Sequence, residues 1–300
     1  MSIKSIDFIV IIEYNVPEVD MIDISPSLGI IIGLIACIAE YIDSSLGMGY
    51  GTALTPILLL FGFDPAVIVP SVLLSECITG LSAAVIHAKV KNVSFFPKGL
   101  HLSTLALECK RSGTVKTLAH MLSRAAKTAC IISCSSAAAT VCAVIFAVSI
   151  SSFYVKLYIG VMILAVGIVL LCSFRQKPAF SWTKIAVLGA VASFNKGVSG
   201  GGYGPVVTGG QILAGIDGKS AIAVTALAEG ITCLVGVSAY VISRGFAQLE
   251  LVPYLVVGAL FSVPLSALTV KHLHIKKLTG MIGIITTLLG LLTLLKLFFL

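Results

Sequence analysis

Residues 47–51 read Gly-Met-Gly-Tyr-Gly, and the same pattern returns at residues 200–204 as Gly-Gly-Gly-Tyr-Gly. The match continues without a gap in the same register. Thr55, Gly62, Asp64, Leu74, Glu76, Ile78 and Thr79 meet Thr208, Gly215, Asp217, Leu227, Glu229, Ile231 and Thr232. Apolar residues of two membrane segments can coincide by chance, but a matching set of glycines, a tyrosine and a glutamate at one fixed offset does not arise that way. The chain therefore consists of two copies of one unit.

Composition places both copies in a membrane. Of the 300 residues, 58% are hydrophobic and only 11% are charged, and the mean hydropathy is +1.09. Stretches close to the ~20 residues that cross a bilayer predict spanning helices. They are residues 65–88, 128–150, 153–173, 220–242, 251–270 and 278–299.

Two further pairs of apolar segments are shorter and interrupted by glycine. Residues 28–42 with 52–61 form one pair, and residues 183–194 with 205–216 form the other. We interpret each pair as a broken or re-entrant helix. Because backbone amides in lipid need internal partners and the alternation of a β-barrel is absent, we expect an all-α polytopic membrane protein of about ten segments.

Basic residues fall in loops between the spans, which indicates membrane topology rather than nucleic-acid binding. Residues 89–127, 175–184 and 271–277 carry most of them, so these loops are predicted to be cytoplasmic. Residues 1–25 form an acidic N-terminal segment. No signal peptide is recognisable. We expect a multi-pass protein of the cell (inner) membrane with both termini outside.

The first repeat is predicted to span residues 26–175 and the second residues 183–300. The basic loop after the third segment corresponds to an almost uncharged loop after the eighth, so the halves should have opposite topology. This predicts a 5+5 inverted repeat. The first half alone carries a hydrophilic cytoplasmic insertion at about residues 92–127. In its second part an apolar face and a basic face alternate with helical period, which predicts an amphipathic helix on the membrane surface.

The two glycine clusters are the candidate binding site. Glycines let backbone amides point at a ligand, and the following half-helix adds the positive end of its dipole, which suits a small anion. The alternative is that the glycines only allow close helix packing. The candidate substrate-binding residues are Ser44, Ser45, Gly47, Gly49, Tyr50, Gly51, Asn195, Lys196, Ser199, Gly200, Gly201, Gly202, Tyr203 and Gly204.

A few ionisable residues lie within or beside apolar segments, where charge is costly and usually functional. Glu76 and Glu229 are equivalent in the two repeats. Asp43 and Lys196 are also equivalent, and their opposite signs would suit a pair. Lys196 would attract an anion, whereas the two glutamates, favoured in the protonated form by burial, would carry protons. A structural role, with each glutamate capping broken-helix amides, stays open.

These residues resemble the sulfite exporter TauE/SafE family of two-halved membrane permeases. The resemblance extends from Gly29 onward and is strongest at residues 47–91 and 188–244. The resemblance rests on two motifs. One is the glycine-rich turn before a half-helix, and the other is a Gly-x-Asp that begins the next helix, at residues 62–64 and 215–217. It implies transport of sulfite, a sulfonate or another small sulfur-containing or organic anion.

Other functions fit the sequence less well. We find no protease, hydrolase or metalloenzyme motif, so we do not expect an enzyme. A cation carrier that uses Glu76, Glu229 and Asp43 is the main rival, and a membrane scaffold is another. We expect no cofactor and no metal site. The expected partners are a small anionic solute and the lipid bilayer, with a homodimer as a further option. His87 should lie at the cytoplasmic interface.

The topology can be tested by labelling introduced cysteines. A cysteine at Ser112 or Lys177 should react only with a reagent applied from the cytoplasmic side, because basic loops stay there. A cysteine at Ser152 should react from outside. Labelling at Ser112 from outside would contradict the inverted repeat.

Overall fold

The computed structural model of the chain describes residues 24–95, 123–172, 181–245, 249–270 and 275–299. These residues form ten helices and no strand. The helices are α1 (Pro26–Leu46), α2 (Tyr50–Leu60), α3 (Pro65–Lys89), α6 (Arg124–Ser149), α7 (Ser152–Cys172), α8 (Trp182–Ser199), α9 (Tyr203–Leu213), α10 (Gly218–Arg244), α11 (Val252–Thr269) and α12 (Ile275–Phe299). The predicted all-α fold is confirmed.

Seven of the described helices are long and apolar enough to cross a membrane: α1, α3, α6, α7, α10, α11 and α12. By contrast, α2 and α9 have eleven residues each. At 1.5 Å per residue such a helix is about 16 Å long, roughly half of the hydrocarbon core. Each short helix follows a break after α1 or α8, as the two glycine clusters predicted.

Local sequence signals place the helix ends. Ser25 caps α1 and Asp64 caps α3, and each is followed by a proline whose fixed φ suits the first helical position. At the breaks, Gly47 ends α1 and Gly200 ends α8, both in the left-handed conformation. Glycine adopts that conformation without the clash that a Cβ brings, so the chain can turn into the short helix.

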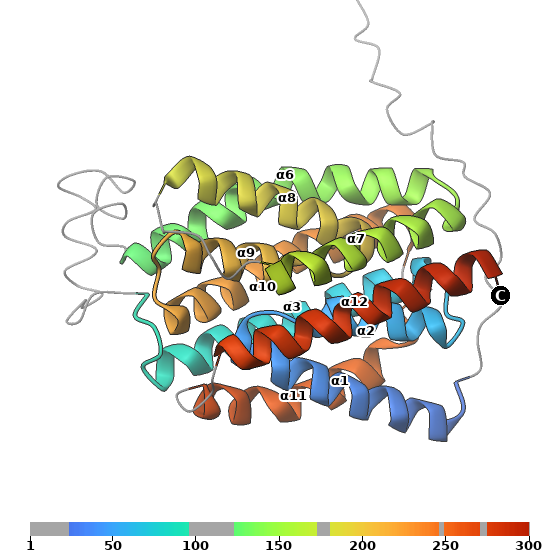
Figure 1. Cartoon of the computed structure of the whole chain (residues 1–300), viewed down its shortest axis with the longest axis horizontal. Coiled ribbons are helices and arrows are strands. Elements are labelled where there is room, and N and C mark those ends of the chain that lie inside the picture. Colours follow the sequence, from blue (N-terminus) through green and yellow to red (C-terminus); the bar gives the residue numbers. More distant parts are fainter. Residues whose placement is uncertain (1–23, 96–122, 173–180, 246–248, 271–274, 300) are drawn as a thin grey trace, which may run out of the picture.

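The helices lie side by side in one bundle (Figure 1). Packed pairs are α1 with α11, α3 with α10, α6 with α8, and α7 with α12. Of the seven long apolar helices, α3 and α10 are the most enclosed, since 67% and 72% of their apolar windows are buried. They therefore form the centre of the molecule, and the ionisable residues that they carry are held away from lipid.

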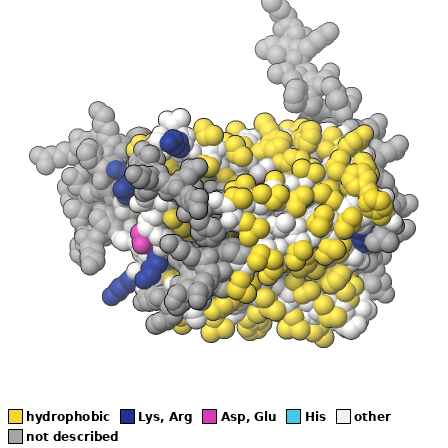
Figure 2. All heavy atoms as spheres, in the orientation of Figure 1, with side chains coloured by type: hydrophobic (Ala, Val, Ile, Leu, Met, Phe, Trp, Pro, Cys, Tyr) yellow, Lys and Arg dark blue, Asp and Glu magenta, His cyan; other side chains and the backbone are white. Residues whose placement is uncertain are grey.

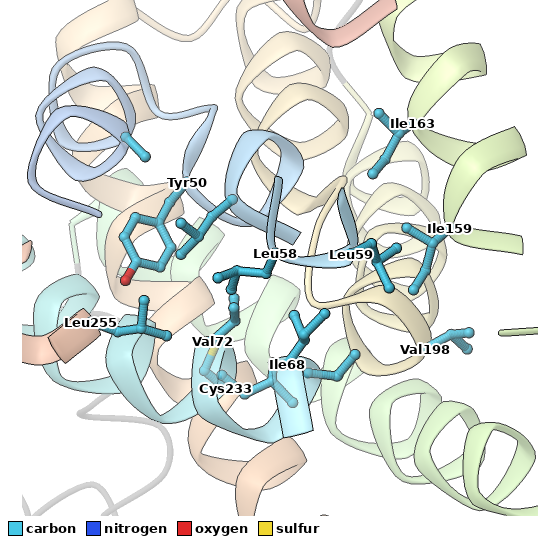
Figure 3. Packing of buried hydrophobic residues seen from close by; sticks show 14 of the residues in the cluster. Tyr50, Leu58, Leu59, Ile68, Val72, Ile159, Ile163, Val198, Cys233 and Leu255 are labelled. Atoms are coloured by element: carbon cyan, nitrogen blue, oxygen red, sulfur yellow. The ribbon is translucent and has the colours of Figure 1, made fainter. Parts of the chain in front are cut away.

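The apolar core joins both halves. Leu58 of α2 packs in one cluster with Ile68 and Val72 of α3 and with Cys233 of α10 (Figure 3). Tyr50, at the first position of α2, is completely buried in the same cluster. Because the short helix contributes buried side chains to this cluster, it is held by packing on its long neighbours rather than by its own length.

The outer surface is apolar over the middle of the molecule. Figure 2 shows yellow side chains along the centre, with most of the lysines and arginines visible on this face gathered at the end where α3 finishes and α6 begins. Exposed hydrophobic side chains occur on α1, α7, α11 and α12, for example Ile38, Val169, Phe261 and Leu288. A broad apolar belt of this kind matches a surface in contact with lipid.

One detail differs from the sequence-based expectations: α1 is a helix of 21 residues that extends past the predicted segment 28–42 through buried Ser44 and Ser45. Most of the predicted amphipathic helix lies outside the described residues, and its last part belongs to α6, since Ser123 caps that helix. His87 lies in the last turn of α3 and is fully buried against other parts of the protein. Residues 1–23 of the acidic segment lie outside the described residues.

The contact of α1 with α11 yields a stability prediction. A Cβ added to Gly258 would lie 2.0 Å from the carbonyl oxygen of Gly33, so Gly258→Ala must push the two helices apart. Overpacking of this kind costs about 1–3 kcal/mol, so the variant should unfold at lower temperature in detergent. Gly209→Ala is the matched control, because nothing lies within 4 Å of its added Cβ. Equal melting temperatures for both variants would contradict the packing described here.

Candidate functional site

The two glycine clusters meet each other at the centre of the bundle. A Cβ on Gly51 would lie 1.8 Å from the carbonyl oxygen of Gly200, and one on Gly204 would lie 2.4 Å from that of Gly47. Only glycine permits such an approach of one backbone to another. The close-packing role, which the sequence left as an alternative, therefore applies at Gly51 and Gly204.

Hydroxyl groups connect the two breaks. Thr208 Oγ1 donates to the carbonyl oxygen of Gly47 at 2.7 Å, and the amide of Gly202 donates to Thr52 Oγ1 at 3.1 Å. Thr208 also bonds Thr225 of α10. Each short helix is thus tied to the break in the other half. A movement of one half at this point must change hydrogen bonds in the other.

A charged triad lies beside this crossing. Lys196, in the last turn of α8, is 1% exposed and extends between Glu229 of α10 and Glu76 of α3. Its Nζ donates to Glu229 Oε1 at 2.8 Å and forms a second ion pair with Glu76. Glu76 Oε1 also accepts the amide of Gly51 at 3.2 Å. The two equivalent glutamates therefore share one lysine.

The position of Glu76 has an electrostatic reason. Gly51 belongs to the first turn of α2, where free amides and the helix dipole favour a negative group. Lys196 provides a full positive charge on the other side of the same carboxylate. Removal of water from such charges costs several kcal/mol per ion, so the group is stable only while the partners stay together.

The sequence suggested Asp43 as the partner of Lys196, and the structure shows a different pairing. The described ion pairs of Lys196 are with Glu76 and Glu229. Asp43 is only half-buried and its Oδ1 accepts the amide of Tyr50, the first residue of α2, at 3.3 Å. The reason is tertiary: the contact of α3 with α10 brings the two glutamates together at the end of α8.

Glu40 was not among the sequence-predicted site residues. It lies on α1, is 1% exposed, and accepts hydrogen bonds from Ser44 Oγ at 2.5 Å and Thr79 Oγ1 at 3.0 Å. A charged residue within an otherwise apolar segment was the signal that could have identified it. Glu40, Asp43, Glu76 and Glu229 line one small cavity of about 10 Å³, close to the smallest space that can hold one water molecule.

The remaining serines of the first cluster bond within their own half. Ser44 Oγ donates to Glu40, and the carbonyl oxygen of Ser44 meets His87 Nε2 at 2.9 Å. Ser45 Oγ donates to the carbonyl oxygen of Ile42. Gly49 precedes α2 with φ of 142°, where a side chain would be strained.

In the second cluster, Ser199 Oγ accepts the amide of Gly201 at 3.1 Å and donates to the carbonyl oxygen of Asn195 at 2.7 Å. Asn195 Oδ1 accepts a bond from the hydroxyl of Tyr158. These groups therefore already have protein partners. In this arrangement the amides of Gly51, Gly201 and Gly202 all donate to side-chain oxygens.

The two repeated tyrosines are buried completely. Tyr50 Oη bonds Ser75 Oγ of α3 at 2.8 Å, and Tyr203 Oη bonds Thr232 Oγ1 of α10 at 3.4 Å. They anchor each short helix to the central helix of the same half. Within the described residues, no group of three or more histidines, cysteines, aspartates or glutamates is arranged to hold a metal ion.

Half-length helices that meet at a buried charged site, within a bundle of apolar helices, are the architecture of a membrane transporter. The family model described as sulfite exporter TauE/SafE matches residues 32–107 and 112–293. The chain belongs to this family. It is also 26% identical over 268 residues to a protein of Bacillus subtilis (strain 168) named "Probable membrane transporter protein YtnM". That match covers 85% of this chain and 78% of the relative. No solved structure matches the chain.

The triad can be tested through stability. Lys196→Met leaves Glu76 and Glu229 buried without their cation, which typically costs about 3–5 kcal/mol. The single variant should therefore unfold at much lower temperature than the unmodified protein. A triple variant, Lys196→Met with Glu76→Gln and Glu229→Gln, should recover most of that loss, because no charge is left unpaired. If the triple variant is no more stable than the single one, the three residues do not act as a unit.

Proposed function

We propose that this membrane transporter carries a small anion across the cytoplasmic membrane, together with protons. The candidate substrates are sulfite, a sulfonate or another sulfur-containing or organic anion, a class that the description of the family as a sulfite exporter supports. The observation on which the proposal depends is Lys196, a buried cation that faces two carboxylates at the contact of the two breaks.

The charges of the triad suggest why protons would accompany the anion. One ammonium and two carboxylates leave a net charge of −1 in a site without bulk water. Carboxylates already occupy the contacts of the Lys196 ammonium, so an anion can reach it only at a position that a carboxylate now holds. An anion placed beside that carboxylate, with both still charged, would be costly. Protonation of one glutamate frees a position on the lysine. The incoming anion then restores the same net charge, so anion and proton bind together.

Glu76 already occupies the place that such an anion would take. Its carboxylate combines an amide at the start of a half-helix with a lysine ammonium. Sulfite and sulfonate groups have the same requirements, negative charge and several acceptor oxygens. In this proposal Glu76 or Glu229 withdraws from Lys196 when it is protonated, and the anion takes its place.

We further propose that the two halves have opposite topology. Helices α1, α3 and α6 of the first half correspond to α8, α10 and α11 of the second. The contact of α1 with α11 therefore has an equivalent in that of α8 with α6, and both contacts are extensive. In the same way, the contact of α3 with α11 is equivalent to that of α10 with α6. In Figure 1, the packed helices α7 and α12 run in opposite directions. These features support an inverted repeat, whose breaks would alternate between the two sides of the membrane.

The proposal is tested by flux measurements in proteoliposomes. The protein should accumulate labelled sulfite or a small sulfonate when a pH gradient is imposed, and much less without one. Lys196→Met should lose anion binding most, since it removes the buried cation. Glu229→Gln mimics the protonated acid and cannot release a proton, so it should keep anion binding and lose accumulation driven by pH.

Flux of a labelled cation provides the decisive comparison. Four carboxyl groups around the cavity would also attract Na⁺ or a divalent ion, so cation flux is measured under the same conditions. Transport of the cation without the anion would replace the proposed function with cation transport. Pyruvate-sized organic anions and sulfate extend the series and define how large and how charged the substrate is.

A further inference from the structure

Glu40 differs from Glu76 and Glu229 by having no cation. Among the described residues, no lysine, arginine or histidine pairs with it, although it is 1% exposed. Its two oxygens instead bond two neutral hydroxyls, those of Ser44 and Thr79. By comparison, Glu76 and Glu229 share Lys196. Asp43 is half-buried and accepts a backbone amide.

Among the described residues, the other groups on the cavity of Glu40 add negative charge, and the nearby His87 has both ring nitrogens bonded, to the carbonyl oxygen of Ser44 and to Asn92. Helix α1 itself supplies Asp43, α3 supplies Glu76, and α10 supplies Glu229, all on the same cavity. Lys196 of α8 is engaged by the two glutamates. The described part of α11, which packs along α1, carries one titratable side chain, Tyr254, and this lies at the far end against Gly29.

A carboxylate in these surroundings would be both desolvated and repelled. An isolated buried charge is so costly that the group takes up a proton instead. As a neutral acid, Glu40 fits the same contacts, because a hydroxyl can reverse its role and accept from the acid O–H. The geometry therefore favours a protonated Glu40, which lines the same small cavity as the two glutamates of the triad.

We propose that Glu40 is the proton donor for the central triad, an inference that rests on the proposed function. When an anion approaches Lys196, the O–H bond of Glu40 breaks and a new O–H bond forms on Glu76 or Glu229. Glu40 is then a carboxylate until a proton from solution restores it. Glu40, Glu76 and Glu229 line the same cavity, whose volume of about 10 Å³ is close to the smallest that can hold the single water molecule such a transfer would use. Glu40 is a proton relay and does not touch the substrate.

Infrared spectroscopy tests the proton directly and needs no substrate. A buried protonated acid has a carbonyl stretching band that ionised carboxylates lack and that shifts in D₂O. At neutral pH the unmodified protein should show this band, and Glu40→Gln should lose it. Asp217→Asn is the matched control, since Asp217 is an exposed cap of α10 and its replacement should leave the band unchanged. A band that persists in Glu40→Gln overturns the proposal.

Two further variants keep the result decisive if Glu40→Gln fails to fold. Thr79→Val removes one hydroxyl from Glu40, so it should shift the band without removing it. Glu40→Asp retains a carboxyl group and should retain a band at a changed position. If neither variant alters the band, the protonated acid lies elsewhere and Glu40 is not the donor.

Transport separates this inference from the proposed function. Glu40→Gln should lose accumulation driven by a pH gradient, whereas Asp217→Asn should retain it. If the unmodified protein moves no anion, the proposed function fails, whatever the infrared result. If the unmodified protein accumulates anion in response to pH and folded Glu40→Gln does so equally, the proposed function stands and the role of Glu40 is wrong.

Discussion

The arrangement of the site depends on one interaction, the contact of the Lys196 ammonium with the carboxylates of Glu76 and Glu229. These three charges come from α8, α3 and α10, so their pairing links both halves at the centre of the bundle. Lipid offers no alternative partners for them, which makes each charge dependent on the other two. Any change of conformation that exposes the site must keep, replace or protonate these partners.

The breaks in the helices explain how the charges come so close. Gly51 and Gly204 allow the backbone of each half to contact the other, and the short helices α2 and α9 stop inside the bundle instead of crossing it. A half-helix presents its amide-bearing end to the interior, where Glu76 accepts the amide of Gly51. The glycine clusters therefore serve packing and charge placement together, since the close approach is what puts a helix end beside a buried carboxylate.

Much of this was readable from the sequence, and the exceptions have physical causes. Periodicity and charge distribution predicted the long helices and the two breaks, because both are local properties of the chain. The length of α1 was underestimated, since Ser44 and Ser45 end its apolar pattern although both are buried within the helix. His87 is buried, with Nε2 against the carbonyl oxygen of Ser44. Such contacts join segments far apart in sequence, so no local pattern reports them.

The sequence by itself determined that the chain is a helical membrane protein with a duplicated unit, two glycine breaks and buried ionisable residues at Lys196, Glu76 and Glu229. Composition and repetition are sufficient for those conclusions, because they depend on residue type and spacing alone. Only the tertiary structure decided which charges pair. Asp43 and Lys196 occupy equivalent positions in the two copies, yet Lys196 meets the glutamates and Glu40 is left with hydroxyls. The packing of α3 on α10 sets those distances, and electrostatic energy depends on distance rather than on order along the chain.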